Sequence, residues 1–203
     1  MLTADQRRDL HDALAHRIHS LQNGYLADSP AAKGQLAAVR RGGRDVESWG
    51  LVAEVVPPGL QGRDDEPNPV ETAVSLALQF YALHQQGRTA PMHASGVDLG
   101  RGLRSLVATQ LVSEAGVHRR LGAVLTATDL TEAAHHLRGL VTQLRADQIP
   151  IDHARLGVDL VLLQDPRTAP GVRLRWVRSL RTPDSTTSPH TDQADASAEN
   201  QEG

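Results

Sequence analysis

The segment NPVETAVSLALQFYALH, residues 68–84, decides the fold class of this 203-residue chain. It opens with signals for a helix start. Asn68 can accept hydrogen bonds from the first backbone amides, Pro69 suits the first helical position, and Glu71 lies three residues after the cap. Apolar side chains then cover most of the helix circumference, which is typical of a helix buried at the centre of a domain. We therefore expect a core helix that ends at Gly87.

Apolar residues recur at helical spacing on both sides of this segment, and no stretch shows the alternation of a strand. The pattern predicts further helices up to Gly24, over residues 33–41, 46–55, 98–109 and 113–127, from Asp129 onward, and over 152–164 and 172–181. We therefore predict an all-α protein with an N-terminal helical domain (residues 1–110) and a C-terminal helical bundle (111–181). Residues 182–203 are rich in Ser, Thr, Asp, Gln and Glu and are expected to form a disordered acidic tail.

The composition excludes several classes of protein. The chain has no cysteine, so disulfide frameworks and thiolate zinc sites are ruled out. No apolar run approaches the roughly 18 residues of a membrane span, and the N-terminus lacks the apolar run of a signal peptide. These features predict a cytoplasmic protein.

The basic residues are nearly all arginines and are unevenly distributed. Lys33 is the one lysine, and the net charge of the chain is −3. Residues 101–181 nevertheless hold twelve arginines and seven acidic residues, whereas 182–203 hold five acidic residues and no Lys or Arg. Because a planar guanidinium can bond two phosphate oxygens at once, this pattern favours a polyanion-binding face. A GC-rich genome would also replace lysine by arginine, but it would not determine where the arginines lie.

The sequence offers no candidate for catalysis. Ten histidines are present, yet His16 and His19, one helical turn apart, lack a carboxylate or third imidazole at the spacing of a helical zinc site. The His135-His136 pair lacks them as well, so ordinary surface or boundary histidines are expected. Nucleophile-elbow and phosphate-loop patterns are missing. We therefore expect a protein that is not an enzyme and has neither a metal nor another cofactor.

Three arginines bracket a glycine pair at the end of the second predicted helix. Gly42 and Gly43 would let backbone amides approach a ligand, and Arg40, Arg41 and Arg44 could converge on one phosphate path. The alternative is that these cations stabilise the negative end of the helix dipole. Three arginines exceed what one helix end requires, which favours phosphate binding.

Further arginines extend the candidate surface. Arg101 and Arg104 share one helix face. Arg119 and Arg120 point about 100° apart, so only one is expected to face solvent, the other forming a structural ion pair. Arg138 fits a solvated helix face equally well. The complete predicted nucleic-acid-binding set is Arg40, Arg41, Arg44, Arg101, Arg104, Arg119, Arg120, Arg138, Arg167 and Arg173. Most of the five aromatic residues occupy core positions, so binding should be electrostatic and tolerant of sequence rather than based on stacking.

The order of several short motifs carries a resemblance to a known family. They are LAAVRRG (36–42), LGR (99–101), RRL (119–121), HLR (136–138), IPID (149–152), LVLL (160–163) and RWVR (175–178). Over residues 35–181 the chain resembles the CasB family, the small subunit of the type I-E Cascade complex of CRISPR immunity. One departure is His118, where relatives usually have an acidic residue before the Arg-Arg pair.

The resemblance implies a two-part helical fold and a non-catalytic role. The implied partners are the large subunit and the CRISPR RNA-binding backbone subunits of Cascade, a second copy of the chain, CRISPR RNA and target DNA. The implied function is to bind the nucleic-acid backbone without sequence specificity and to stabilise the R-loop through the displaced strand. Two alternatives remain: a free-standing helical DNA-binding regulator, and a pure protein scaffold whose arginines meet acidic partner surfaces.

Overall fold

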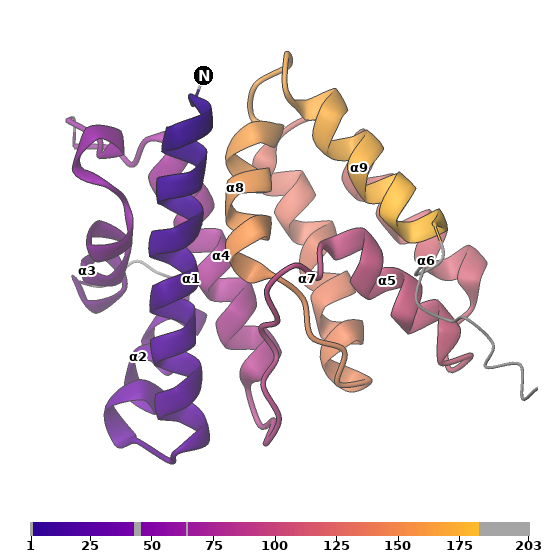
Figure 1. Cartoon of the computed structure of the whole chain (residues 1–203), viewed down its shortest axis with the longest axis horizontal. Coiled ribbons are helices and arrows are strands. Elements are labelled where there is room, and N and C mark those ends of the chain that lie inside the picture. The colour runs from indigo at the N-terminus through magenta and orange to yellow at the C-terminus, as the bar shows by residue number, and fades with distance from the viewer. Residues whose placement is uncertain (1, 43–45, 64, 183–203) are drawn as a thin grey trace, which may run out of the picture.

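The computed structural model describes residues 2–42, 46–63 and 65–182. Within these ranges it contains helices and no strand, which confirms the all-α prediction (Figure 1). The helices are α1 (Ala4–Leu26), α2 (Pro30–Arg40), α3 (Val46–Val55), the 3-10 turn η1 (Pro58–Leu60), α4 (Pro69–Gln85), α5 (Leu99–Ala108), α6 (Glu114–Thr126), α7 (Leu130–Ala146), α8 (His153–Leu163) and α9 (Ala169–Arg181). The predicted acidic tail lies outside the described residues, apart from Thr182.

Local hydrogen bonds fix where the helices begin. At the start of α4, Asn68 Oδ1 accepts from the amides of Val70 (2.8 Å) and Glu71 (3.0 Å), and Glu71 Oε2 accepts from the amide of Asn68 (2.9 Å). This reciprocal cap confirms the predicted start of the core helix. Thr3 forms a reciprocal cap with Gln6 at the start of α1. At the starts of other helices, one first-turn amide donates to the side chain of the cap residue, which is Ser29, Asp98, Ser113, Asp129 or Asp152. The last helix begins earlier than the predicted residue 172, because Pro170 occupies its first turn.

Helix α4 lies at the centre of the fold. Its side chains Ala73, Val74, Ala77, Leu78 and Tyr81 are at most 1% exposed. It packs most extensively against α8 and also contacts α2, α3 and α7. In Figure 1, α1, α2 and α3 lie on one side of this centre and α5, α6 and α9 on the other. The wide apolar arc of residues 68–84 therefore reflects contacts on several faces, as predicted.

Helix contacts run across residue 110, where the sequence placed a domain boundary. Helix α8, from the expected C-terminal bundle, packs mainly on α1 and α4, while α5 packs mainly on α9. The buried apolar side chains form one cluster that includes residues of both parts. The two-domain division stays a prediction.

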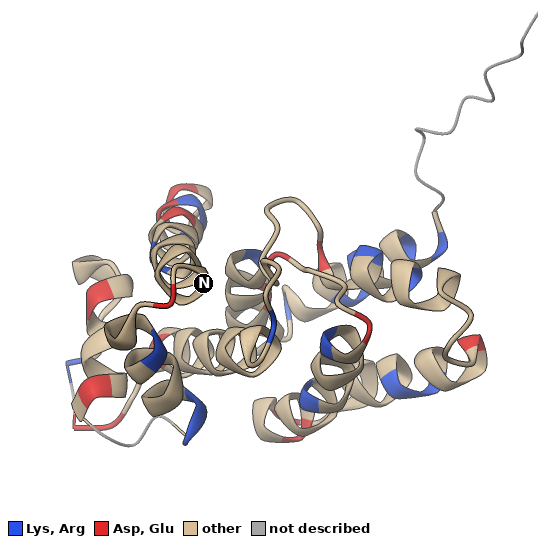
Figure 2. Ribbon diagram, turned by 90° about the horizontal axis from the view of Figure 1, so that it is seen from below, with Lys and Arg blue, Asp and Glu red and all other residues tan. Residues whose placement is uncertain are grey.

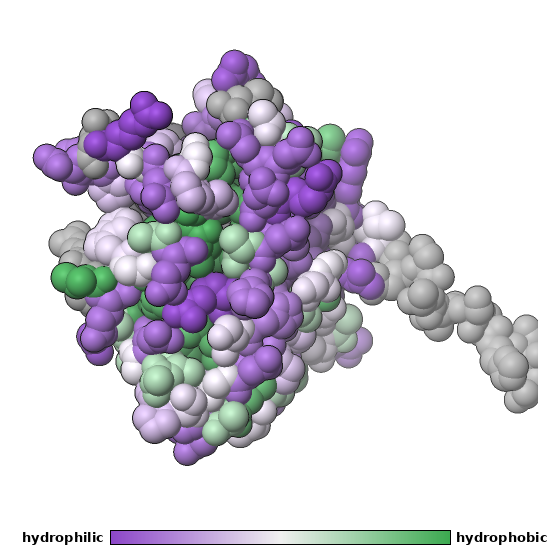
Figure 3. Space-filling model, turned by 60° about the vertical axis from the view of Figure 1, so that its left-hand side comes forward, coloured by the Kyte–Doolittle hydropathy of each residue, from purple (hydrophilic) through white to green (hydrophobic). Residues whose placement is uncertain are grey.

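Apolar side chains are exposed at a few of the described positions. Figure 3 shows one face on which green apolar atoms are visible between hydrophilic side chains. Val46 at the start of α3 is 90% exposed and Leu111 is 76% exposed. None of the described helices combines the length and the apolar character needed to span a membrane.

Candidate nucleic-acid interface

The end of α2 carries two of the predicted arginines. The amide of Arg41 donates to the carbonyls of Ala37 and Ala38, and Gly42 then takes a φ of +114° that favours glycine. Arg40 is half-buried and Arg41 is exposed. Arg44 lies outside the described residues. The proposed convergence of three guanidiniums at this turn therefore stays a prediction.

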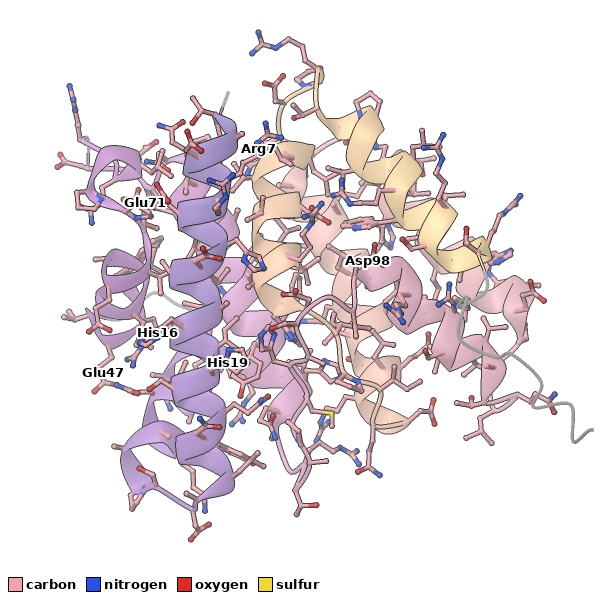
Figure 4. All side chains as sticks on the ribbon, in the orientation of Figure 1. Arg7, His16, His19, Glu47, Glu71 and Asp98 are labelled. Carbon is pink, nitrogen blue, oxygen red and sulfur yellow. The ribbon has the colours of Figure 1, made fainter. Side chains whose placement is uncertain are left out.

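Helices α5 and α9 are joined by polar contacts that involve the predicted set. Asp98 caps α5 through its Oδ1, which accepts from the amide of Arg101 at 2.8 Å, and its Oδ2 accepts from the Ser179 hydroxyl at 2.6 Å (Figure 4). Arg104 donates from Nη1 to the carbonyl of Ser179 (2.8 Å) and to that of Thr182. Arg101 is exposed, but Arg104 holds the last turn of α9. The sequence did not indicate this structural role, because Thr182 lies 78 residues away in the chain.

Arg119 and Arg120 are both exposed on α6. The prediction that one of them faces away from solvent is wrong. Helix α6 packs mainly on α7 and buries Val117, Leu121 and Val124 along one stripe, so both arginines fall on the wide remaining arc. Arg138 on α7 is exposed as well. These three arginines remain accessible to a polyanion.

Arg167 and Arg173 have different surroundings. Arg167 forms a two-pronged ion pair in which Nε and Nη2 donate to Asp165 Oδ1 (3.1 Å) and Oδ2 (3.0 Å). These hydrogen bonds lower the pKa of the Asp165 carboxyl. Arg173 is half-buried beside a groove between α6, α7 and the start of α9. The charge of Arg167 is therefore already compensated within its own loop.

The predicted arginines do not form one cluster. In Figure 2, Lys and Arg positions occur at both ends of the molecule, with α2 at one end and α5, α6 and α9 at the other. The structure brings Arg101 and Arg104 together on α5 and leaves Arg40 and Arg41 on the opposite side of the centre.

A second group of basic side chains, which was not predicted from the sequence, lines a cleft. Arg7, Arg8 and His11 of α1, Arg155 of α8 and Arg175 of α9 line one cleft of about 430 Å³. The Arg7-Arg8 pair was visible in the sequence. Its association with Arg155 was not, because almost 150 residues separate them and only the packing of α1 on α8 brings them together.

Asp159 is a buried residue that pairs with two of the arginines lining this cleft. Its side chain is 1% exposed, and Oδ1 accepts from Arg175 Nη2 at 2.5 Å and lies 3.3 Å from Arg155 Nε. Oδ2 accepts from the indole Nε1 of Trp176 at 2.8 Å. Burial raises the pKa of the Asp159 carboxyl, while the two guanidiniums and the indole oppose that rise. One buried carboxylate thus positions two of the guanidiniums of the cleft.

The chain matches a known protein family over most of its length. The model of the family described as CRISPR-associated protein Cse2 matches residues 35–179, which is more than half of the chain. The chain belongs to this Cse2 family. The match includes α3 to α8, the C-terminal part of α2, most of α9, and the arginines of α2, α5 and α6, but it excludes α1.

Solved structures support the assignment to the Cse2 family. CasB from Thermobifida fusca is 32% identical, with a TM-score of 0.75, and the match covers 86% of this chain and 98% of that one. CasB from Thermus thermophilus is 26% identical, with a TM-score of 0.61 and coverage of 84% and 96%. A chain of a CRISPR RNA-guided surveillance complex shares the fold, at 23% identity and a TM-score of 0.65, with coverage of 84% and 95%. No curated protein matches the chain in a comparison of sequences.

This Cse2-family chain also buries three histidines. His84, His93 and His153 are at most 3% exposed, so the prediction of surface or boundary histidines is wrong for them. His84 Nδ1 lies 3.2 Å from His153 Nε2, and the amide of His153 donates to His93 Nδ1 at 3.1 Å. Figure 4 labels His19 on α1, whose ring lies 4.7 Å from that of His93. Among the described residues, no group of three or more His, Cys, Asp or Glu is placed to hold a metal ion.

Burial determines the protonation of these rings. It lowers the pKa of His84 and of His93 to about 4 in each case, and it lowers the pKa of His153 well below its ordinary value of 6.5. The ring nitrogens His84 Nε2, His93 Nε2 and His153 Nδ1 are buried and have no hydrogen-bond partner in the described structure. The cluster is therefore neutral and belongs to the core.

Proposed function

We propose that this protein is the non-catalytic small subunit of a type I-E CRISPR surveillance complex. In this role it would bind nucleic-acid backbone without sequence preference and stabilise the R-loop by holding the displaced strand. The observation that carries the proposal is the Cse2-family match over residues 35–179. The shared fold of a chain in a CRISPR RNA-guided surveillance complex supports it. The proposed partners are the large and backbone subunits, a second copy of the chain, CRISPR RNA and target DNA.

The chemistry of the exposed arginines suits this role. The RNA–DNA duplex formed in an R-loop is about as stable as the DNA duplex it replaces, so a few kcal/mol of strand capture can shift the balance. Arg41, Arg101, Arg119, Arg120 and Arg138 are exposed, and a guanidinium can pair with phosphate in a two-pronged geometry. We assign Arg104 and Arg167 a smaller contribution to binding of the displaced strand, because both already bond to groups within the chain.

Replacing Arg40, Arg41 and Arg44 together by alanine is expected to shorten the lifetime of the R-loop in the assembled complex. Loss of their phosphate contacts should reduce that lifetime roughly tenfold, which corresponds to about 1.4 kcal/mol. The lifetime is measured by dissociation of labelled target DNA from purified complex. Arg63→Ala with Arg178→Ala, two exposed arginines outside the predicted set, is the control and should change it less than twofold. An unchanged lifetime in a fully assembled triple variant would overturn the assignment.

Binding of single-stranded oligonucleotides by the isolated protein is expected to be weak and strongly dependent on salt. If about four phosphates are neutralised, a plot of log K against log salt concentration should have a slope near −3. Fluorescence anisotropy at several salt concentrations gives this slope. A regulator would instead prefer one duplex sequence, and a protein scaffold would show no affinity even at low salt.

A further inference from the structure

The cleft between α1, α8 and α9 has the features of a small-anion site. Guanidiniums of Arg7, Arg8, Arg155 and Arg175 come to it from three different helices. Val158 and Leu162 supply an apolar floor. Figure 4 shows Arg7 near the N-terminal end of α1, on the side that faces α8. Charged groups at a rim and apolar side chains below them are typical of a pocket that holds an anionic group attached to an apolar or planar body.

The cleft has more guanidinium than carboxylate. Asp159 is the partner of both Arg155 and Arg175, so one negative charge is shared between two positive ones. Arg7 donates from Nε to the carbonyl of Thr3 at 3.2 Å, and no carboxylate among the described residues pairs with it. The guanidinium of Arg7 can therefore bond an incoming anion without first breaking an ion pair within the described structure.

Phosphate fits this arrangement better than a carboxylate does. A carboxylate offers two oxygens in one plane, whereas a phosphate group offers several in a tetrahedral arrangement and can be reached from three helices at once. We propose that the cleft binds a nucleotide unit, with its phosphate on Arg7, Arg155 and Arg175 and its sugar or base against Val158 and Leu162. The volume of about 430 Å³ accommodates a ligand of that size.

None of the residues that line this cleft belongs to the arginines proposed for the R-loop surface. Arg7, Arg8 and His11 precede residue 35, so they lie outside the region matched by the family. The chemistry at the site is the same whether the phosphate belongs to a free nucleotide or to a strand that passes across the cleft. The experiment must therefore distinguish these two sources.

The test measures the binding of thymidine monophosphate and of a thymidine pentanucleotide to the full-length protein by titration calorimetry. Arg7→Gln with Arg8→Gln should weaken both at least fivefold. These substitutions spare the buried Asp159, and the one ion pair they remove, between exposed Arg8 and Asp5, contributes little to stability. Arg63→Gln with Arg178→Gln is the charge-matched control and should change either affinity less than twofold. Equal affinities of the two ligands for the wild type point to a free nucleotide, and at least tenfold tighter binding of the pentanucleotide points to a strand.

Two results would overturn the proposal. One is that neither ligand binds, or that both bind the Arg7/Arg8 variant as tightly as the wild type. The other is that citrate displaces thymidine monophosphate at equal concentration, which would indicate a carboxylate-bearing partner instead. The outcome is independent of the R-loop assignment, because the variant lacking Arg40, Arg41 and Arg44 should still bind thymidine monophosphate as the wild type does.

Discussion

Gly100→Ala is expected to destabilise the protein by roughly 2 kcal/mol or more, although alanine is the better helix former. An added Cβ would lie 2.2 Å from the carbonyl oxygen of Trp176 and 2.9 Å from Ser179 Cβ. The first of these atoms belongs to the backbone of α9 and cannot rotate away. Helices α5 and α9 would have to separate, and the buried indole of Trp176 would lose contacts. Urea unfolding followed by circular dichroism measures the change.

Gly139→Ala is the matched control for this substitution. Gly139 is an exposed residue in the middle of α7, and an added Cβ would meet no atom within 4 Å. The same chemical change should there stabilise the protein by about 0.5–1 kcal/mol, because alanine restricts the unfolded chain and favours the helix. If both substitutions stabilise the protein, the close approach of α5 to α9 is wrong.

Stability is expected to fall steeply as the pH decreases below about 6.5. In the unfolded chain, His84, His93 and His153 have an ordinary pKa of 6.5, whereas in the folded protein it is about 4 for the first two and well below 6.5 for the third. Between these values the unfolded state binds more protons, so acid favours unfolding. The stability contributed by neutral rings is complete above pH 6.5 and is lost progressively toward pH 4.

Within this window, each histidine should lower the free energy of unfolding by up to ~1.4 kcal/mol for every unit by which the pH decreases. The three together should lower it by roughly 4 kcal/mol per unit. Urea midpoints at pH 7.5, 6.5 and 5.5 measure the effect. His153→Gln should lower the free energy of unfolding at pH 7.5. It should also reduce the number of protons taken up on unfolding by about one, so that stability depends less steeply on pH. His16→Gln, at an exposed position on α1, should leave the dependence unchanged. A stability that is flat from pH 7.5 to 5.5 would contradict the burial of the cluster.

Local sequence signals account for most of the helices. The Asn68–Glu71 cap and the apolar stripe of α4 act within a few residues, so their consequences could be predicted without the rest of the chain. The same holds for α3, whose predicted bounds of 46 and 55 agree with the structure. The core positions of Phe80, Tyr81 and Trp176 followed from helical spacing and are confirmed by exposures of 4% or less.

The sequence by itself determined the helical class, the helix caps, the core stripes and the likeness to Cse2-family proteins, because these depend on residues close together in the chain or on their order. Only the tertiary structure decided which charges meet. It placed Arg7 with Arg155 and Arg175, gave Arg104 the carbonyls at the end of α9, and buried His84 against His153. Helical periodicity shows that a residue faces the core or the solvent, but not which distant helix packs there, and that choice determines the partners of every charged group.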